Sequence, residues 1–272
     1  DPAKPDLSVN LKYNLSPNVT LDAAVNPDFA EIEADAPVVS ANQRFPIYFE
    51  EKRAFFLEGK DIFSSPLQPF YSRTIVDPDL AAKVTGKIGP TSFGFLVASD
   101  NAPGNYSDDE RGELLNCQRA REFDPPNNKR RCGIEEFVDK NAFFGVLRLK
   151  RDFGKENNIG FSATSRIFPK NRNFTGGFDG QFKLNPKTVM KFQVLGTHSR
   201  KFFYDPKLDR SKYRTGNGFG YSFNIDYTTD RHGWFAEATG RTSDYRADAG
   251  FTRRTDSNTF FFANRLSTKS NP

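Results

Sequence analysis

The feature that most limits the fold is a repeated alternation of apolar and polar residues in the second half of the chain. Over residues 218–227, "GFGYSFNIDY", one face of an extended strand carries the apolar side chains Phe219, Tyr221, Phe223, Ile225 and Tyr227. Ser222, Asn224 and Asp226 lie on the other face. The same period recurs over residues 159–168, 177–184 and 190–194. Because an α-helix cannot keep a period of two, these segments are predicted to be β-strands.

Composition indicates which side of the strands faces water. The 272 residues include 29 Phe, yet the mean hydropathy is −0.66 and only 36% of residues are hydrophobic. A soluble domain of such low hydropathy would rarely carry so many phenylalanines. A membrane β-barrel resolves the conflict, because its lipid-facing aromatics alternate with polar residues that face a wet interior. A soluble β-rich domain is the alternative.

The connections between these segments differ in length in a regular way. Short turns are predicted in "IGPTS", "DFGKENN", "LNPKT" and "TTDRHG", whereas residues 165–177, residues 198–218 and the stretch around the cysteines are predicted to be long loops. Short periplasmic turns opposite long extracellular loops are typical of outer-membrane barrels. The predicted fold is therefore an all-β, antiparallel transmembrane β-barrel, or a large part of one, with roughly a dozen strands.

The environment of the chain follows from the same pattern. The sequence contains no run of roughly 18 apolar residues, so no transmembrane helix is predicted. Residues 1–272 are expected to be a single outer-membrane barrel region and a fragment of a longer protein, located in the cell outer membrane of a Gram-negative bacterium. Outer-membrane lipid and lipopolysaccharide are the expected partners, with other envelope proteins or missing strands of the same protein at the sheet edges. The dispersed net charge of +5 does not suggest nucleic-acid binding.

Cys117 and Cys132 flank a polar, proline-containing stretch that is typical of an exposed loop. A disulfide between them would close a loop of about 15 residues and contribute about 3 kcal/mol. Such a bridge implies an oxidising compartment. Metal binding is the weaker alternative, because the spacing fits no common zinc pattern.

Residues 27–80 interrupt the alternation with a mixture of charge, proline and aromatics that is too long for a turn. The combination of "SPNVTLDAAVNPDFAEIEAD", "RFPIYFEEKRAFFLEGKDIF" and "DPDLAAKVTGKIG", with "DYRADAGFTRR" at residues 244–254, resembles a bacterial family of unknown function. Members of that family join an N-terminal domain like a family 9 carbohydrate-binding module to a C-terminal outer-membrane β-barrel. The resemblance covers the barrel part and implies an envelope location, with no reaction attached.

The charged string in this interruption is a candidate lumen plug or constriction. Its charged side chains are expected to pair with inward strand faces while Phe55, Phe56 and Leu57 pack the segment down; they are Glu50, Glu51, Lys52, Arg53, Glu58, Lys60 and Asp61. A purely structural role and a substrate-contacting constriction are both open. Glu31, Glu33 and Asp35 share one face of an extended chain and form a second candidate, a cation or salt-bridge face, with salt bridges favoured.

The sequence does not favour an enzyme. His198 and His232 lie in no recognisable metal or triad motif, and no nucleophile elbow, zinc helix or phosphate loop occurs. No catalytic residue, metal site or cofactor is predicted. Two functions are considered: a porin-like channel that transports small solutes, with inward residues such as Arg148, Gln181, Lys183, Asn224 and Asp226, or a plugged barrel that serves as a structural or docking component of an envelope complex.

Overall fold

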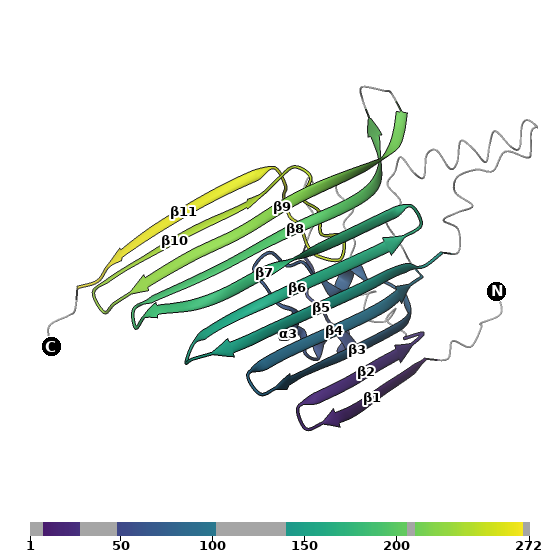
Figure 1. The fold of residues 1–272 in the computed structure, drawn as a ribbon, viewed down its shortest axis with the longest axis horizontal. Coiled ribbons are helices and arrows are strands. Elements are labelled where there is room, and N and C mark those ends of the chain that lie inside the picture. Colours follow the sequence, from purple (N-terminus) through teal and green to yellow (C-terminus); the bar gives the residue numbers. More distant parts are fainter. Residues whose placement is uncertain (1–7, 28–47, 102–139, 206–209, 269–272) are drawn as a thin grey trace, which may run out of the picture.

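A computed structural model describes residues 8–27, 48–101, 140–205 and 210–268. These residues form one antiparallel sheet of eleven strands in which each strand pairs with its neighbours in the chain (Figure 1). The strands are β1 (Val9–Ser16), β2 (Val19–Val25), β3 (Pro78–Ile88), β4 (Thr91–Asp100), β5 (Ala142–Phe153), β6 (Asn157–Phe168), β7 (Asn171–Asn185), β8 (Thr188–Asp205), β9 (Arg210–Thr228), β10 (His232–Arg241) and β11 (Ser257–Leu266). The prediction of an all-β antiparallel fold is confirmed.

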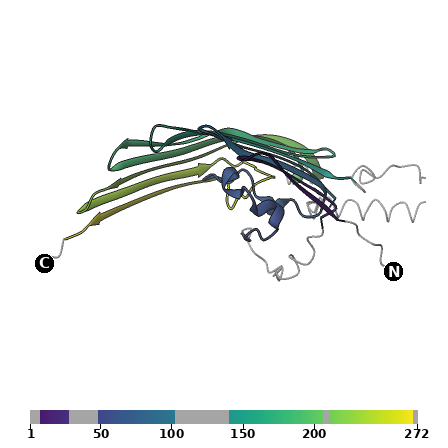
Figure 2. The same ribbon diagram turned by 90° about the horizontal axis from the view of Figure 1, so that it is seen from below.

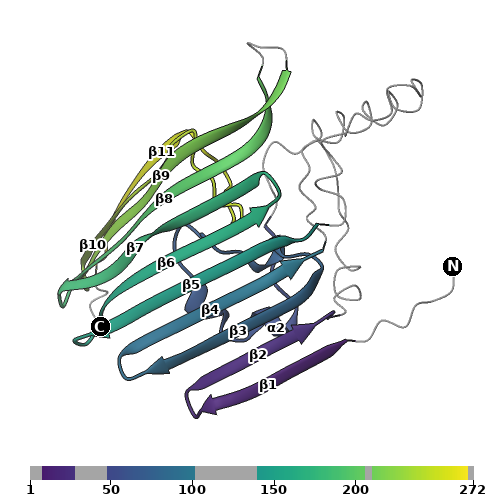
Figure 3. The same ribbon diagram turned by 45° about the vertical axis from the view of Figure 1, so that its right-hand side comes forward.

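The sheet is strongly curved and open. Figure 2 shows it edge-on as an arch, with a convex face above and a concave face below. Two one-turn helices, α2 (Ala54–Leu57) and α3 (Lys60–Phe63), lie against the concave face together with a 3₁₀ turn, η1 (Ser72–Thr74). Figure 3 shows α2 behind the strands from another side. In the described part of the chain, β1 and β11 form the two open edges.

The two faces differ sharply in polarity. Cross-strand partners point to the same face, so the register assigns each side chain. Exposed large apolar side chains occupy the convex face, among them Phe95, Phe143, Leu149, Ile159, Ile167, Phe174, Phe178, Val194, Phe219 and Phe223. Buried polar side chains occupy the concave face, among them Lys83, Thr85, Arg148, Ser162, Thr164, Asn173, Thr175, Asp179, Gln193, Thr197 and Ser222.

The connections separate by length only in part, because the short β6–β7 and β8–β9 connections lie at the same end of the sheet as the long ones. The turns β1–β2, β3–β4, β5–β6, β7–β8 and β9–β10 are short and lie at one end of the sheet, which we call the turn end. The connections β2–β3, β4–β5 and β10–β11 at the opposite end, the loop end, are long. No helix among the described residues has both the length and the apolar character needed to cross a membrane.

Two segments that were predicted to be long loops are mostly strand. Residues 165–177 were expected to form a long loop, but β6 continues to Phe168, and only Pro169 and Lys170 separate it from β7. The polarity that suggested a loop belongs to concave-face side chains such as Asn173 and Thr175. Residues 198–218 are likewise mostly strand, because β8 continues to Asp205 and β9 begins at Arg210.

The interruption predicted over residues 27–80 ends before Pro78, which is the first residue of β3. A proline is tolerated there because the first strand residue need not donate to the ladder. The described part of the interruption, residues 48–76, is called the inner segment below.

Candidate functional site

The inner segment is held together by a buried ion pair at its start. Glu51 and Arg53 are both buried, and the Glu51 carboxylate accepts from Arg53 Nε at 2.9 Å and from Arg53 Nη2 at 2.8 Å. Arg53 Nη1 also donates to the carbonyl of Ile75 at 2.6 Å, and Nη2 donates to the carbonyl of Ser72 at 2.9 Å. The guanidinium therefore ties the beginning of the inner segment to its end.

The environment of Glu51 favours its charged form. Burial alone would raise the pKa of the Glu51 carboxyl, but hydrogen bonds from Arg53 and Ser72 and the charge of Arg53 outweigh that effect and lower the pKa to about 2. Ser72 Oγ donates to Oε2 at 2.5 Å. Glu51 is therefore ionised at neutral pH, and the pair is a satisfied structural unit.

Lys83 on β3 fixes α2 to the concave face. Its ammonium donates to the carbonyls of Phe55 and Glu58, each at 2.6 Å, and lies 3.3 Å from Asp22 Oδ2 on β2. These carbonyls flank the end of α2, where carbonyl groups lack helical partners and favour a nearby cation. The Glu58 side chain reaches Lys12 on β1 and forms an ion pair that is largely exposed. Two lysines of the sheet, which is called the wall below, thus contact one turn of the inner segment.

Farther along, Gln193 on β8 fixes the stretch after α3. Its Oε1 accepts from the backbone N–H of Leu67 at 2.6 Å, and its Nε2 donates to Ser65 Oγ at 2.9 Å. Gln193 is completely buried, so both of its amide groups are used inside the molecule.

Apolar contacts fill the space between these anchors. Phe56 and Phe63 pack into a cluster with Leu96, Phe144 and Phe168 from the wall. Gly94 on β4 makes room for this packing, because a Cβ there would lie 2.6 Å from Cζ of Phe63. The cavity between the inner segment and the wall, beside Lys83 and Leu96, has a volume of only about 90 Å³. The inner segment is therefore closely packed on the sheet.

A second stretch, residues 242–256 between β10 and β11, lies beside the inner segment on the concave face. Asn173 on β7 donates to the carbonyl of Arg246 at 2.9 Å and accepts from the N–H of Asp248 at 3.0 Å. The backbone of Tyr71 donates to the carbonyl of Ala249 at 2.9 Å. Tyr245 is fully buried, and burial raises its pKa to about 12. Two segments distant in sequence thus cover the wall together.

A third concave-face feature is the ion pair of Arg148 on β5 with Asp179 on β7. The two residues contact each other across β6, through both oxygens of the carboxylate. Gly160 on the intervening strand leaves room for this pair, because a Cβ there would lie only 2.6 Å from Arg148 Nη1 and 2.9 Å from Asp179 Oδ1. The pair is largely buried and braces three strands from the inside.

The structure separates the predicted plug residues into groups. Glu51 and Arg53 pair with each other rather than with the wall, and Glu58 pairs with Lys12 on β1. The side chains of Glu50, Lys52, Lys60 and Asp61 are exposed. Of the three packing residues, Phe56 is buried and Phe55 partly buried, but Leu57 is exposed and was wrongly assigned to the packed side. With one helical turn only, α2 cannot turn three consecutive residues toward the sheet.

The remaining predicted residues either lie at defined strand positions or fall outside the described residues. Arg148, Gln181, Lys183, Asn224 and Asp226 share the concave face by their register. Glu31, Glu33, Asp35, Cys117 and Cys132 lie outside the described residues. His198 contacts Asn217 at 2.7 Å, and His232 contacts Asn264 at 2.9 Å. No group of metal-ligating side chains occurs in the described ranges.

Sequence reasoning missed the wall anchors Lys83, Gln193 and Asn173. A usable signal exists, because each is a polar residue at the inward position of an alternating strand, in "AAKVT", "KFQVL" and "NRNFT". Alternation assigns these side chains to a face but does not say which of them a distant segment will contact.

The comparison with protein families agrees with the unknown-function assignment. Residues 3–83 match a family model described as a domain of unknown function, DUF5916. The match includes β1, β2, much of β3 and the whole inner segment, but less than half of the chain. The chain matches no curated protein sequence.

Proposed function

We propose that this chain forms wall strands of a transmembrane β-barrel in the outer membrane of a Gram-negative bacterium, with the inner segment as a lumen plug. One observation carries the proposal: the convex face exposes many large apolar side chains, whereas the concave face buries polar side chains beside its apolar cluster. Phe143 and Phe178 on the convex face are 58% and 52% exposed, whereas Asn173 and Gln193 on the concave face are 0% exposed. Soluble proteins rarely expose apolar patches beyond about 600 Å².

Strand length supports the same proposal. Strands β4, β5 and β6 have 10, 12 and 12 residues. At about 3.3 Å per residue they are long enough to cross a bilayer at a tilt of about 40°. On the convex face of β5 the apolar side chains run from Phe143 to Leu149, before the exposed Arg151 near the turn end. The aromatic Phe153 follows Arg151 on the same face, so charged and aromatic side chains both lie at this end of the strand, as at the interfacial border of a lipid-facing band.

Among the described residues, the outer edges of β1 and β11 have no partner strand. In lipid, each unpaired N–H or C=O group on an outer edge costs several kcal/mol. We therefore expect the outer edges of β1 and β11 to be paired in the membrane, with each other or with strands of the same protein or a partner chain.

The plugged barrel is the better supported function, because the concave face is covered by two segments that are hydrogen-bonded to it. Such a barrel acts as a structural or docking component of an envelope complex. A porin-like channel for small solutes is the second candidate. It is favoured by the partly or fully exposed polar side chains of Asn224, Asp226 and Glu237 on the concave face of β9 and β10.

Conductance of the full-length protein in planar bilayers tests the choice. We expect low conductance for the wild type and higher conductance for Gln193→Ala combined with Lys83→Met, because these changes remove the wall anchors of the inner segment. The matched control is Gln181→Ala, another concave-face glutamine, whose amide donates to Glu156 at 3.1 Å. Large solute-permeable currents from the wild type would reject the plug and favour the channel. Failure to float with vesicles would reject the membrane barrel itself.

A further inference from the structure

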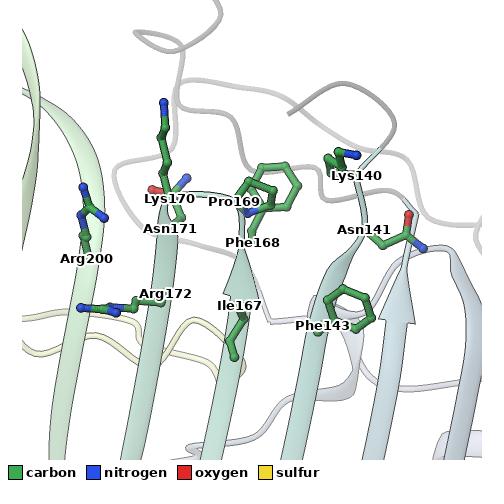
Figure 4. A pocket seen from close by; sticks show the side chains of 10 residues that line it. All are labelled: Lys140, Asn141, Phe143, Ile167, Phe168, Pro169, Lys170, Asn171, Arg172 and Arg200. Atoms are coloured by element: carbon green, nitrogen blue, oxygen red, sulfur yellow. The ribbon is translucent and has the colours of Figure 1, made fainter. Parts of the chain in front are cut away.

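A pocket at the loop end of the convex face combines positive charge with apolar surface. Figure 4 shows the side chains that line it, contributed by β5 to β8 and the residues beside them. Four of these residues are cationic: Lys140, Lys170, Arg172 and Arg200. The pocket has a volume of about 560 Å³, and the described residues that line it include no acidic side chain. Charge complementarity therefore favours an anion as its occupant.

The register brings two of the cations together. Arg172 on β7 is the direct cross-strand partner of Arg200 on β8. Like charges directly opposite each other destabilise a strand pair. The Arg200 guanidinium also lies 4.9 Å from the ring of Tyr213, a contact that leaves its charge in place. An anion held between the two arginines would offset their repulsion.

The same row of residues continues into apolar surface. Ile167 pairs with Arg172 on one side and with Phe143 on the other, so all three side chains share the convex face. Ile167 is 45% exposed and Phe143 is 58% exposed. Farther down β7, Phe174 and Phe178 continue the apolar face toward the turn end. The cations therefore lie at one border of the apolar band.

This arrangement matches the two parts of a phosphorylated lipid. Arginine binds phosphate through two parallel charged hydrogen bonds, and lysine contributes further positive charge. An acyl chain attached to the same headgroup would lie over Phe143 and Ile167. Several clustered cations suit a headgroup with more than one phosphate, and the loop end of a barrel faces the outer leaflet.

We propose that Arg172 and Arg200, together with Lys140, bind the phosphate groups of a phosphorylated glycolipid of the outer leaflet, such as the lipid anchor of lipopolysaccharide. The inference rests on the proposed barrel, because it requires the convex face to lie in the membrane. It adds a specific lipid site to a surface that would otherwise contact lipid only through apolar side chains.

The test uses the full-length protein inserted into phosphatidylcholine vesicles, with and without a small fraction of the purified phosphorylated lipid anchor. Insertion is measured by flotation, and retained glycolipid by mass spectrometry of the protein extracted in mild detergent. The variant is Arg172→Gln with Arg200→Gln. The matched control is Arg151→Gln, because Arg151 is an exposed arginine on the same face near the turn end.

We expect all three proteins to float equally and the double variant to retain at least about tenfold less glycolipid than the wild type and the control. Equal flotation with equal glycolipid retention would overturn the lipid site and leave the barrel intact. Absence of flotation for the wild type would overturn the barrel and the site together. Binding of inorganic phosphate by the wild type without any retained glycolipid would show that the cations bind free phosphate, which also overturns a lipid as the occupant.

Discussion

Replacing Arg53 with methionine tests whether the buried ion pair holds the inner segment on the wall. The change leaves the Glu51 carboxylate buried without its cation and removes the donors to the carbonyls of Ser72 and Ile75. Loss of one partner of a buried pair costs about 3–5 kcal/mol, and each orphaned buried acceptor costs about 1–3 kcal/mol more. Local detachment of the inner segment rehydrates these groups, so the penalty appears as local opening rather than as unfolding of the sheet.

Hydrogen exchange of the full-length protein, followed by mass spectrometry, measures this local opening of the inner segment. The amides of Phe56 and Leu57 donate to the carbonyl of Arg53, and that of Glu58 donates to the carbonyl of Ala54, so peptides covering α2 report on the segment. A penalty of about 3 kcal/mol predicts exchange roughly a hundredfold faster in Arg53→Met. Amides of β5 and β6 should be unchanged.

Two variants make the result specific. Lys52→Met removes an exposed cation from the position between Glu51 and Arg53, and it should exchange like the wild type. Glu51→Gln combined with Arg53→Met removes both charges and should recover part of the protection, because no unpaired buried charge remains. Equal exchange in Arg53→Met and Lys52→Met would refute the assignment of the pair as the anchor.

Three further outcomes follow from the same contacts. The lowered pKa of Glu51, about 2, means that its ion pair contributes stability above the ordinary glutamate pKa of about 4.3 and loses it as the pH falls toward 2. Pepsin cleavage of the inner segment should therefore rise between pH 4 and pH 2, roughly, in the wild type but vary little in Glu51→Gln. Gly94→Val should displace Phe63 and destabilise the packed segment by about 1–3 kcal/mol in thermal unfolding, whereas Gly196→Val, where the nearest atom to a Cβ is 3.9 Å away, should have little effect. Gly160→Val should separate Arg148 from Asp179 and lower the unfolding temperature as much as Asp179→Ala does, and additive losses in the double variant would contradict that reading.

Alternation in the sequence was sufficient to predict the central parts of many strands and the faces of their side chains. Phe219, Phe223 and Ser222 are assigned correctly because a strand repeats every two residues, whatever its neighbours are. Loop extent was harder to predict, because the polar residues of "NRNFT" occur equally in loops and on inward strand faces. The hydropathy of Asn173 carries no information about the distant backbone that it will bond.

The candidate site was predictable in composition but not in pairing. The string "FEEKRAFF" indicated a charged, aromatic unit. The sequence did not reveal that Glu51 would pair with Arg53, two residues away, rather than with a residue of the sheet. The choice depends on Ser72 and Ile75, which supply the remaining partners of the same guanidinium and carboxylate only after the chain has turned back. Local charge patterns predict such closed units poorly, because their members come from separate turns.

The inner segment depends on the wall for its conformation. Its helices α2 and α3 have four residues each, far below the roughly 12 residues at which an isolated helix becomes marginally stable in water. Their ends are satisfied from outside: Lys83 donates to the carbonyls of Phe55 and Glu58, and Gln193 holds the stretch that follows α3. Each of these wall groups would in turn be a buried, unsatisfied polar group on the concave face if the segment left and water did not enter. Detachment of the inner segment therefore requires hydration of the concave face, so a plug of this kind opens only when water can fill the space that it leaves.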